Sequence, residues 1–158
     1  MHKVLFVCIH NSARSQMAEA FLKQLGGPDF EVESAGFTPT TINPLVVEAM
    51  REEGIDLSAK GTQSVFDLFK KGRVFTHVIT VCDDSQESNC PIYPGMTHRL
   101  HLPFPDPGDL AGDHGEQLRQ TRSIRDSIKN AIKEFIAWSR NEKKLGDSWY
   151  VRNTGRNT

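Results

Sequence analysis

Cys8 and Arg14 are the residues whose types and spacing most directly indicate chemistry in this chain. Cys8 ends an apolar run at residues 4–8, and Arg14 follows six positions later, after a short polar loop. Helical spacing of apolar residues predicts a helix over residues 15–25. A loop that joins a strand to a helix N-terminus directs backbone N–H groups and the positive end of the helix dipole at one point. That point favours a tetrahedral oxyanion.

The same field favours the thiolate form of Cys8, which is the nucleophilic form of a cysteine. The guanidinium of Arg14 can donate two parallel hydrogen bonds to an oxyanion. We therefore predict an oxyanion-binding loop around a nucleophilic Cys8, formed by Ile9, His10, Asn11, Ser12, Ala13, Arg14 and Ser15. The alternative is a Cys8 that serves only as a small buried apolar residue at a strand end. The polar side chains that follow it favour the nucleophile.

Length and composition limit the possible functions. The 158 residues suit one α/β catalytic domain at 1–140, followed by a polar C-terminal tail at 141–158. The formal net charge of −1 argues against nucleic acid and membrane surfaces as partners. No segment resembles a membrane span or a signal peptide, so a cytoplasmic protein is expected. Three cysteines, an odd number, indicate reduced and reactive thiols more than a disulfide framework.

Strands and helices are predicted to alternate along the chain. Strands are expected at residues 4–8, 30–34, 75–81 and 97–102, and helices at 15–25, 43–53, 64–71 and 115–139. This alternation predicts a parallel, doubly wound α/β sheet. Ligands of such sheets bind beyond the carboxyl ends of the strands, where Cys8 lies.

Asp106 follows the last predicted strand and lies between Pro105 and Pro107. The prolines and the nearby Phe104 would partly desolvate its carboxyl group, as a general acid requires. The alternative is an ordinary turn carboxylate, since Asp and Pro are common in turns.

Cys82 and Cys90 enclose a polar, acidic segment directly after the third predicted strand. A segment without apolar anchors is typical of a mobile surface loop. The two thiols are either a redox-active pair, half of a metal site, or unrelated to one another. Zinc would require a second pair of ligands, and the sequence has no Cys-x-x-Cys or His-x₃-His pattern. We therefore expect no metal site and no cofactor.

Taken together, these motifs resemble the low-molecular-weight protein tyrosine phosphatases and, within them, the thioredoxin-coupled arsenate reductases. The match covers about residues 3–138 and is carried by the loop from Cys8 to Ser15, residues 16–19, Ser34-Ala35-Gly36, Asn43-Pro44, Cys82 through Cys90-Pro91, and Asp106-Pro107. The resemblance implies a four-stranded parallel sheet flanked by helices on both faces. It implies that Cys8 is the nucleophile, Arg14 the oxyanion clamp and Asp106 the proton donor. It also implies that Asn11 shapes the loop and that Ser15 hydrogen-bonds the Cys8 sulfur.

The resemblance further implies reduction of arsenate to arsenite. Cys8 would form an adduct with arsenic, Cys82 would attack the Cys8 sulfur, and Cys90 would carry the disulfide outward to thioredoxin. A phosphatase would need Cys8 alone among the three cysteines. Two alternatives stay open, namely a tyrosine phosphatase of the same fold and a non-catalytic module for oxyanion binding or redox sensing.

The sequence departs from the family pattern at His10, where many relatives have glycine, at Ala13, where some have a second loop cysteine, and at two further places. Gly108 follows Asp106-Pro107 where many tyrosine phosphatases carry a tyrosine that lines the site for an aromatic substrate. Its absence argues against efficient binding of phosphotyrosine. Some reductases of the family also hold a monovalent cation beside the loop. Asn11, Glu19 and Ser34 match that cation site, whereas residues 61–65 match it poorly.

Overall fold

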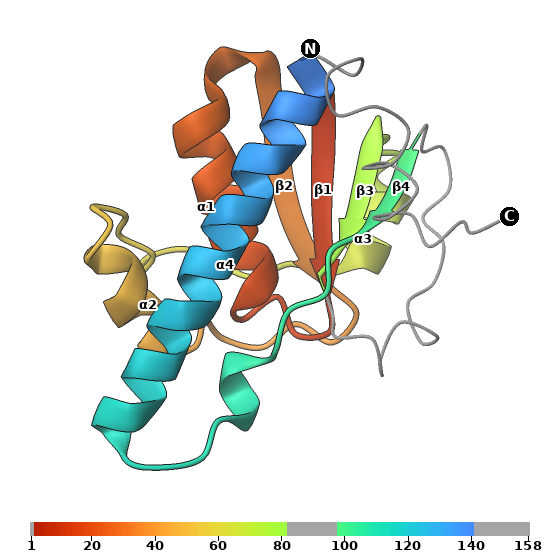
Figure 1. Cartoon of the computed structure of the whole chain (residues 1–158). Helices are drawn as coiled ribbons and strands as arrows, with labels where there is room; N and C mark the ends of the chain where they lie inside the picture. Colours follow the sequence, from red (N-terminus) through yellow and green to blue (C-terminus); the bar gives the residue numbers. More distant parts are fainter. Residues whose placement is uncertain (1, 82–97, 141–158) are drawn as a thin grey trace, which may run out of the picture.

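The computed structural model describes residues 2–81 and 98–140, which form a parallel sheet covered by helices (Figure 1). The strands are β1 (His2–Cys8), β2 (Phe30–Gly36), β3 (His77–Thr80) and β4 (His98–His101). The helices are α1 (Arg14–Gly26), α2 (Pro44–Arg51), α3 (Val65–Lys70) and α4 (His114–Arg140), with short 3₁₀ turns at Gly27–Asp29 and Pro107–Asp109. Cys82, Cys90 and the predicted tail at 141–158 lie outside the described residues.

The four strands pair in the order β2-β1-β3-β4, and every pair is parallel. Val7 of β1 is level with Ala35 of β2 and with Thr80 of β3, and Thr80 is level with His101 of β4. The carboxyl ends of all four strands therefore lie at one edge of the sheet. The predicted four-stranded parallel α/β sheet is confirmed.

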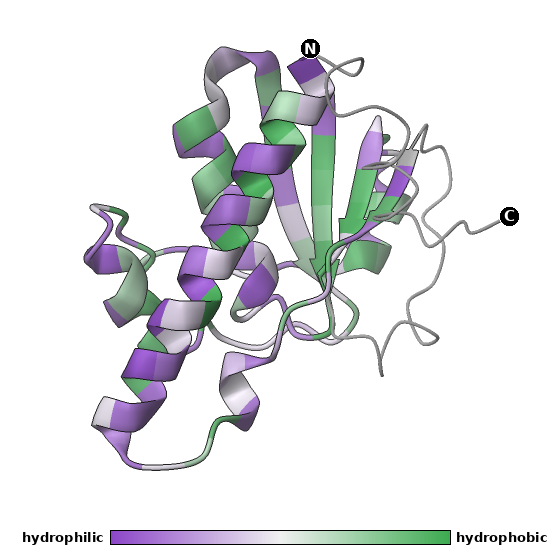
Figure 2. Ribbon diagram, in the orientation of Figure 1, coloured by the Kyte–Doolittle hydropathy of each residue, from purple (hydrophilic) through white to green (hydrophobic). Residues whose placement is uncertain are grey.

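Side chains of β1 alternate between two apolar cores, one on each face of the sheet. Phe6 packs with Phe21, Ile79 and Phe135 in the core under α1 and α4. Leu5 and Val7 belong to the smaller core on the other face, where α3 contributes Val65 and Leu68. Helices thus flank both faces, as predicted. The central part of β1 is apolar throughout (Figure 2), as expected for a parallel strand buried on both sides.

Local chemistry explains where the helices begin. Asn43 caps α2 by accepting a hydrogen bond from the Leu45 N–H, and Pro44 occupies the first helical position. Ser64 caps α3 in the same way through the Phe66 N–H. In residues 2–81 and 98–140, none of the helices has the length and apolar character that crossing a membrane requires.

The third strand is shorter than the predicted 75–81. The Thr76 N–H donates to Lys3 O and the Val81 N–H donates to Val7 O, so pairing with β1 continues at both ends. The full ladder to both neighbours spans only His77–Thr80. The prediction and the structure therefore differ in where this strand begins and ends, and not in topology.

Candidate active site

The loop between β1 and α1 is held by its carbonyl groups. The carbonyl oxygens of Cys8, Ile9, His10 and Ser12 accept hydrogen bonds from the N–H groups of Phe37, Thr38, Thr40 and Asn43, at 3.3, 2.8, 3.0 and 2.9 Å respectively. In a trans peptide unit the C=O and the following N–H point in opposite directions. The N–H groups that follow these carbonyls therefore face the other side of the loop. One of them, the Asn11 N–H, donates to Cys8 Sγ at 3.2 Å.

Asn11 fixes the shape of this loop. Its φ of 53° lies in the left-handed region, which asparagine tolerates better than most residues. Its buried amide is saturated: Oδ1 accepts from Gln63 N at 3.0 Å and from Gln16 Nε2 at 3.1 Å, while Nδ2 donates to Ser15 Oγ at 2.8 Å and Ser34 Oγ at 2.9 Å. Because the Gln63 N–H is a backbone donor, the orientation of the Asn11 amide is determined.

Cys8 lies at the base of the loop with two donors on its sulfur. Its Sγ is 2.9 Å from Ser15 Oγ, in addition to the contact with the Asn11 N–H. Since Ser15 Oγ accepts from the Asn11 amide, the Ser15 hydroxyl hydrogen is free to point at the sulfur. No side chain caps the start of α1, so its first-turn N–H groups and dipole also act on this region. The Ser15 hydroxyl and the Asn11 N–H are thus placed to donate to the Cys8 sulfur.

Arg14 and Asp106 meet beside the loop, although one comes from the start of α1 and the other from the segment after β4. Arg14 Nη1 donates to Phe104 O at 3.2 Å, and Arg14 Nη2 lies 3.5 Å from Asp106 Oδ2. The Asp106 side chain is 15% exposed, and its Oδ1 accepts from the Gly108 N–H. The sequence-predicted clamp and proton donor are thus neighbours on the side of the sheet where Cys8 ends β1.

Gly36 allows β2 to approach the loop closely. A Cβ at this position would lie 2.7 Å from Asn11 N and 2.7 Å from Ile9 O, both backbone atoms. Any side chain would therefore push the loop away from β2. This packing explains why the strand ends in Ser34-Ala35-Gly36.

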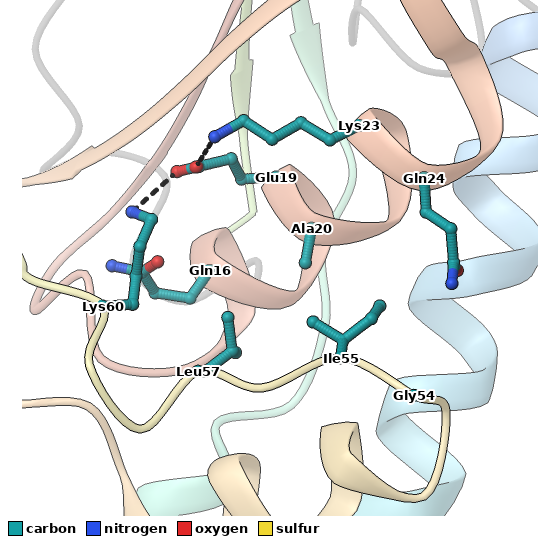
Figure 3. Close-up of a pocket in the computed structure, with 9 residues that line it drawn as sticks. All are labelled: Gln16, Glu19, Ala20, Lys23, Gln24, Gly54, Ile55, Leu57 and Lys60. Atoms are coloured by element: carbon teal, nitrogen blue, oxygen red, sulfur yellow. Dashed lines mark hydrogen bonds and ion pairs between the residues drawn. The ribbon is translucent and has the colours of Figure 1, made fainter.

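A buried carboxylate lies behind the loop. Glu19, on α1, has a side chain only 4% exposed. Its Oε1 accepts from Ser34 Oγ at 2.6 Å. The two lysine pairs, Oε1 with Lys60 Nζ at 3.2 Å and Oε2 with Lys23 Nζ at 2.6 Å, are drawn in Figure 3. We call the hydrogen-bonded series Cys8, Ser15, Asn11, Ser34 and Glu19 the Cys8–Glu19 network.

These residues do not fit a bound monovalent cation. A cation requires free oxygen acceptors, but both Glu19 oxygens take lysine ammonium groups and Ser34 directs its hydroxyl at Glu19. Asn11 Oδ1 already accepts two N–H groups. Within the described ranges 2–81 and 98–140, no group of three His, Cys, Asp or Glu side chains is suited to a metal ion.

Gln16 and Gln63 support the site and were missed in the sequence. Gln16 Nε2 contacts Asn11 O, Asn11 Oδ1 and Gly61 O, each at 3.1 Å. Gln63 binds Asn11 through its N–H and donates its amide to Ser34 O at 2.9 Å. The position of Gln16 in the sequence could have indicated its role. It is a polar residue beside Met17 and Ala18, in the buried first turn of the predicted helix. Gln63 lies 52 residues from Asn11 and left no local signal.

The structure brings Arg14 to Asp106, and it brings Cys8 to Asn11 and Ser15. Other predicted loop residues are more open: Ile9 and Ser12 are half-buried, and His10 is exposed with Nδ1 3.1 Å from Thr38 O. Ala13 is buried against the core. For Cys82 and Cys90 no position is described. The residue before Cys82, Val81, bonds to Val7 O, one residue before Cys8.

Comparison with known proteins decides the family. Residues 3–145 match the family model described as low molecular weight phosphotyrosine protein phosphatase. The chain belongs to this family. It is also 37% identical over 133 residues to arsenate reductase 1 of Staphylococcus saprophyticus, an alignment that covers 84% of this chain and 94% of the relative.

Solved structures agree with this assignment to the low molecular weight phosphatase family. An arsenate reductase in the oxidized state superposes with a TM-score of 0.66 at 28% identity, covering 87% of this chain and 98% of that one. A thioredoxin-dependent arsenate reductase from Corynebacterium glutamicum gives a TM-score of 0.54 at 30% identity, covering 84% of this chain and 62% of that one. The resemblance to arsenate reductases of this family that the sequence motifs indicated is confirmed.

Proposed function

We propose that this protein reduces arsenate to arsenite with Cys8 as nucleophile and thioredoxin as electron donor. The observation that carries the proposal is the Cys8 sulfur, which receives hydrogen bonds from Ser15 and Asn11 beside the Arg14–Asp106 pair. In this proposal the N–H groups of residues 9–15 and the Arg14 guanidinium bind the arsenate oxygens. The arsenate reductases among the relatives support this choice of substrate.

The first step forms a sulfur–arsenic bond. The Cys8 thiolate attacks arsenic, and one arsenate hydroxyl group leaves as water after it receives a proton from Asp106. Arg14 stabilises the charge on the remaining oxygens. Because Arg14 lies 3.5 Å from Asp106 Oδ2, an oxyanion bound by Arg14 would lie close to that carboxyl group.

The later steps transfer two electrons to arsenic. The Cys82 thiolate attacks Cys8 Sγ, an S–S bond forms, and the S–As electron pair leaves with arsenic as arsenite. Cys90 then attacks Cys82 Sγ and releases the Cys8 thiolate. A thioredoxin dithiol reduces the resulting Cys82–Cys90 disulfide and closes the cycle. The end of β3 beside the end of β1 supports Cys82 as the thiol that reaches Cys8 first.

The second candidate is hydrolysis of phosphate monoesters through a cysteinyl-phosphate intermediate. The loop, Arg14 and Asp106 would serve that reaction equally well, because arsenate and phosphate are both tetrahedral oxyanions. Gly108 in place of an aromatic wall and the presence of Cys82 and Cys90 favour the reductase. A pure oxyanion-binding or redox-sensing module gains nothing from a proton donor beside the nucleophile.

One assay separates these candidates. Purified protein is supplied with arsenate, thioredoxin, thioredoxin reductase and NADPH, and NADPH oxidation is compared with arsenite formed. The reductase is expected to consume one NADPH for each arsenite, whereas Cys8→Ser consumes none. Hydrolysis of para-nitrophenyl phosphate without arsenate-linked NADPH oxidation would establish the phosphatase instead. If neither activity is found, the non-catalytic oxyanion-binding or redox-sensing module would be the remaining candidate.

A further inference from the structure

We infer that Lys60 is a positioning residue whose ammonium group fulfils, within the chain itself, the role of a bound monovalent cation beside the active-site loop. Lys60 Nζ pairs with Glu19 Oε1 at 3.2 Å (Figure 3). The same oxygen accepts the Ser34 hydroxyl at 2.6 Å. This is the end of the Cys8–Glu19 network farthest from the thiol.

Donor directions along the network run from Glu19 to Cys8. A carboxylate can only accept, so the Ser34 hydroxyl must point at Glu19. Ser34 Oγ then accepts one Asn11 Nδ2 hydrogen, and the second goes to Ser15 Oγ. The Ser15 hydroxyl is thereby left to donate to Cys8 Sγ. An ionised Glu19 is what gives the series its direction.

Burial makes that ionised state depend on a cation. Burying a charged carboxylate as fully as that of Glu19 costs folding free energy unless the carboxylate is paired with a cation and hydrogen-bonded. Among the described residues, the charged groups that pair with it are Lys23 from its own helix and Lys60 from the loop before α3. At the other end of the network the described charged pair is that of Arg14, which precedes Ser15 at the start of α1, with Asp106.

Lys60 is placed for this role more firmly than Lys23. The Lys60 N–H donates to Leu57 O, and the next carbonyl, that of Gly61, accepts from Gln16 Nε2, which itself contacts Asn11. Lys23 contacts only the outer oxygen, Oε2, and its side chain is 53% exposed. Lys60 therefore couples the loop before α3 to the oxygen that orients Ser34.

A pocket beside the pair makes the inference testable with ions. Lys60, Glu19, Lys23 and Gln16 line it together with Ile55 and Leu57 (Figure 3), and its volume is about 440 Å³. Removing the Lys60 ammonium would expose Glu19 Oε1 to a solvent cation through this pocket. The reactivity of Cys8 in the natural protein should therefore not depend on potassium. In a variant without the Lys60 ammonium it should depend on potassium.

The experiment measures alkylation of Cys8 by iodoacetamide against pH, with the Cys8 peptide quantified by mass spectrometry. Native protein, Lys60→Met, Lys60→Arg and Lys23→Met are compared in potassium chloride and in choline chloride at an ionic strength of about 0.1 M. Circular dichroism checks that each variant is folded. The readout is the thiol itself, so it does not depend on the proposed reduction of arsenate.

Native protein is expected to react equally in both salts. Lys60→Met should react several-fold more slowly at mildly acidic pH in choline and recover in potassium, Lys60→Arg should match the native protein, and Lys23→Met should change less than Lys60→Met. Several-fold stimulation of the native protein by potassium would overturn the inference. A folded Lys60→Met protein with the native rate profile in choline would also overturn it. The same holds if Lys60→Met reacts more slowly and potassium does not restore its rate.

Discussion

Ser15 Oγ lies 2.9 Å from Cys8 Sγ, and a third residue favours Ser15 as the donor between the two atoms. Asn11 Nδ2 donates to Ser15 Oγ, so the Ser15 hydroxyl hydrogen is available to the sulfur. A hydrogen bond to an anion is stronger than one to a neutral group. The Ser15–Cys8 contact therefore favours the thiolate over the thiol.

Ser15→Ala is expected to slow alkylation of Cys8 by about tenfold at mildly acidic pH, because a hydrogen bond to a charged group contributes about 1.5–3 kcal/mol. The measurement is the pH dependence of the iodoacetamide rate at the Cys8 peptide. Ser34→Ala, which acts on the thiol only through Asn11, serves as the control and should have a smaller effect. An unchanged Ser15→Ala profile would contradict the assigned donor direction.

Asp106→Asn is expected to lower kcat for arsenate reduction and for phosphate-ester hydrolysis by about 10² to 10⁴, the usual contribution of a general acid. Asp109→Asn is the matched control, since Asp109 lies in the same 3₁₀ turn and is exposed. Steady-state rates of both variants give the comparison. Equal losses in the two variants would show that the turn, and not the Asp106 carboxyl group, is what matters.

Cys82→Ser and Cys90→Ser should each block repeated turnover of arsenate and spare phosphate-ester hydrolysis, which needs only Cys8, Arg14 and Asp106. After one turnover, mass spectrometry should find a Cys8–Cys82 disulfide in Cys90→Ser and a Cys82–Cys90 disulfide in the native protein. Full thioredoxin-linked turnover in both serine variants would reduce Cys82 and Cys90 to incidental thiols.

Gly36→Ala should destabilise the fold by about 1–3 kcal/mol, the usual cost of overpacking, because its Cβ would collide with the backbone at Ile9 and Asn11. Gly61→Ala is the matched control, since no atom lies within 4 Å of a Cβ built at that glycine. Urea unfolding measures both variants. A Gly36→Ala protein as stable as Gly61→Ala would mean that the loop does not press on β2 as described.

Glu52 gives the fold a pH dependence outside the site. Hydrogen bonds from Arg122, and then from Arg125, lower the pKa of Glu52 from 4.5 to about 2. A carboxyl group with a lowered pKa stabilises the folded state above its unfolded pKa, and this contribution is lost as the pH falls toward the folded value. Glu52→Gln should therefore have a lower Tm than the native protein near neutral pH, and the gap should close between about pH 5 and about pH 2. The exposed Glu31→Gln is the control and should leave the Tm profile unchanged.

The sequence predicted those parts of the site that depend on neighbouring residues. The apolar run ending at Cys8 and the helix opening at Arg14 are local patterns, and they place the nucleophile at the carboxyl end of a parallel strand. Alternation of strands and helices then required the segment after β4 to reach the same edge, which is how Asp106 could be nominated.

Contacts between distant segments could not be predicted in this way. Lys60 meets Glu19 across 41 residues, and no periodicity in either segment indicates that pairing. The distance between Arg14 and Asp106 likewise depends on how β3 separates β1 from β4. A short loop such as residues 55–64 offers many conformations, and contacts with α1, β2 and the active-site loop select one.

Arg14 has a backbone partner 90 residues later in the chain, the carbonyl of Phe104. During synthesis the ribosome therefore releases Cys8 long before the segment that holds its guanidinium neighbour exists. At about 5–20 residues per second, translation separates the two by about 5 to 20 seconds. The central strand β1 also waits for β3 before it is paired on both sides. A nascent chain therefore cannot complete the surroundings of Arg14 until Phe104 has been synthesised.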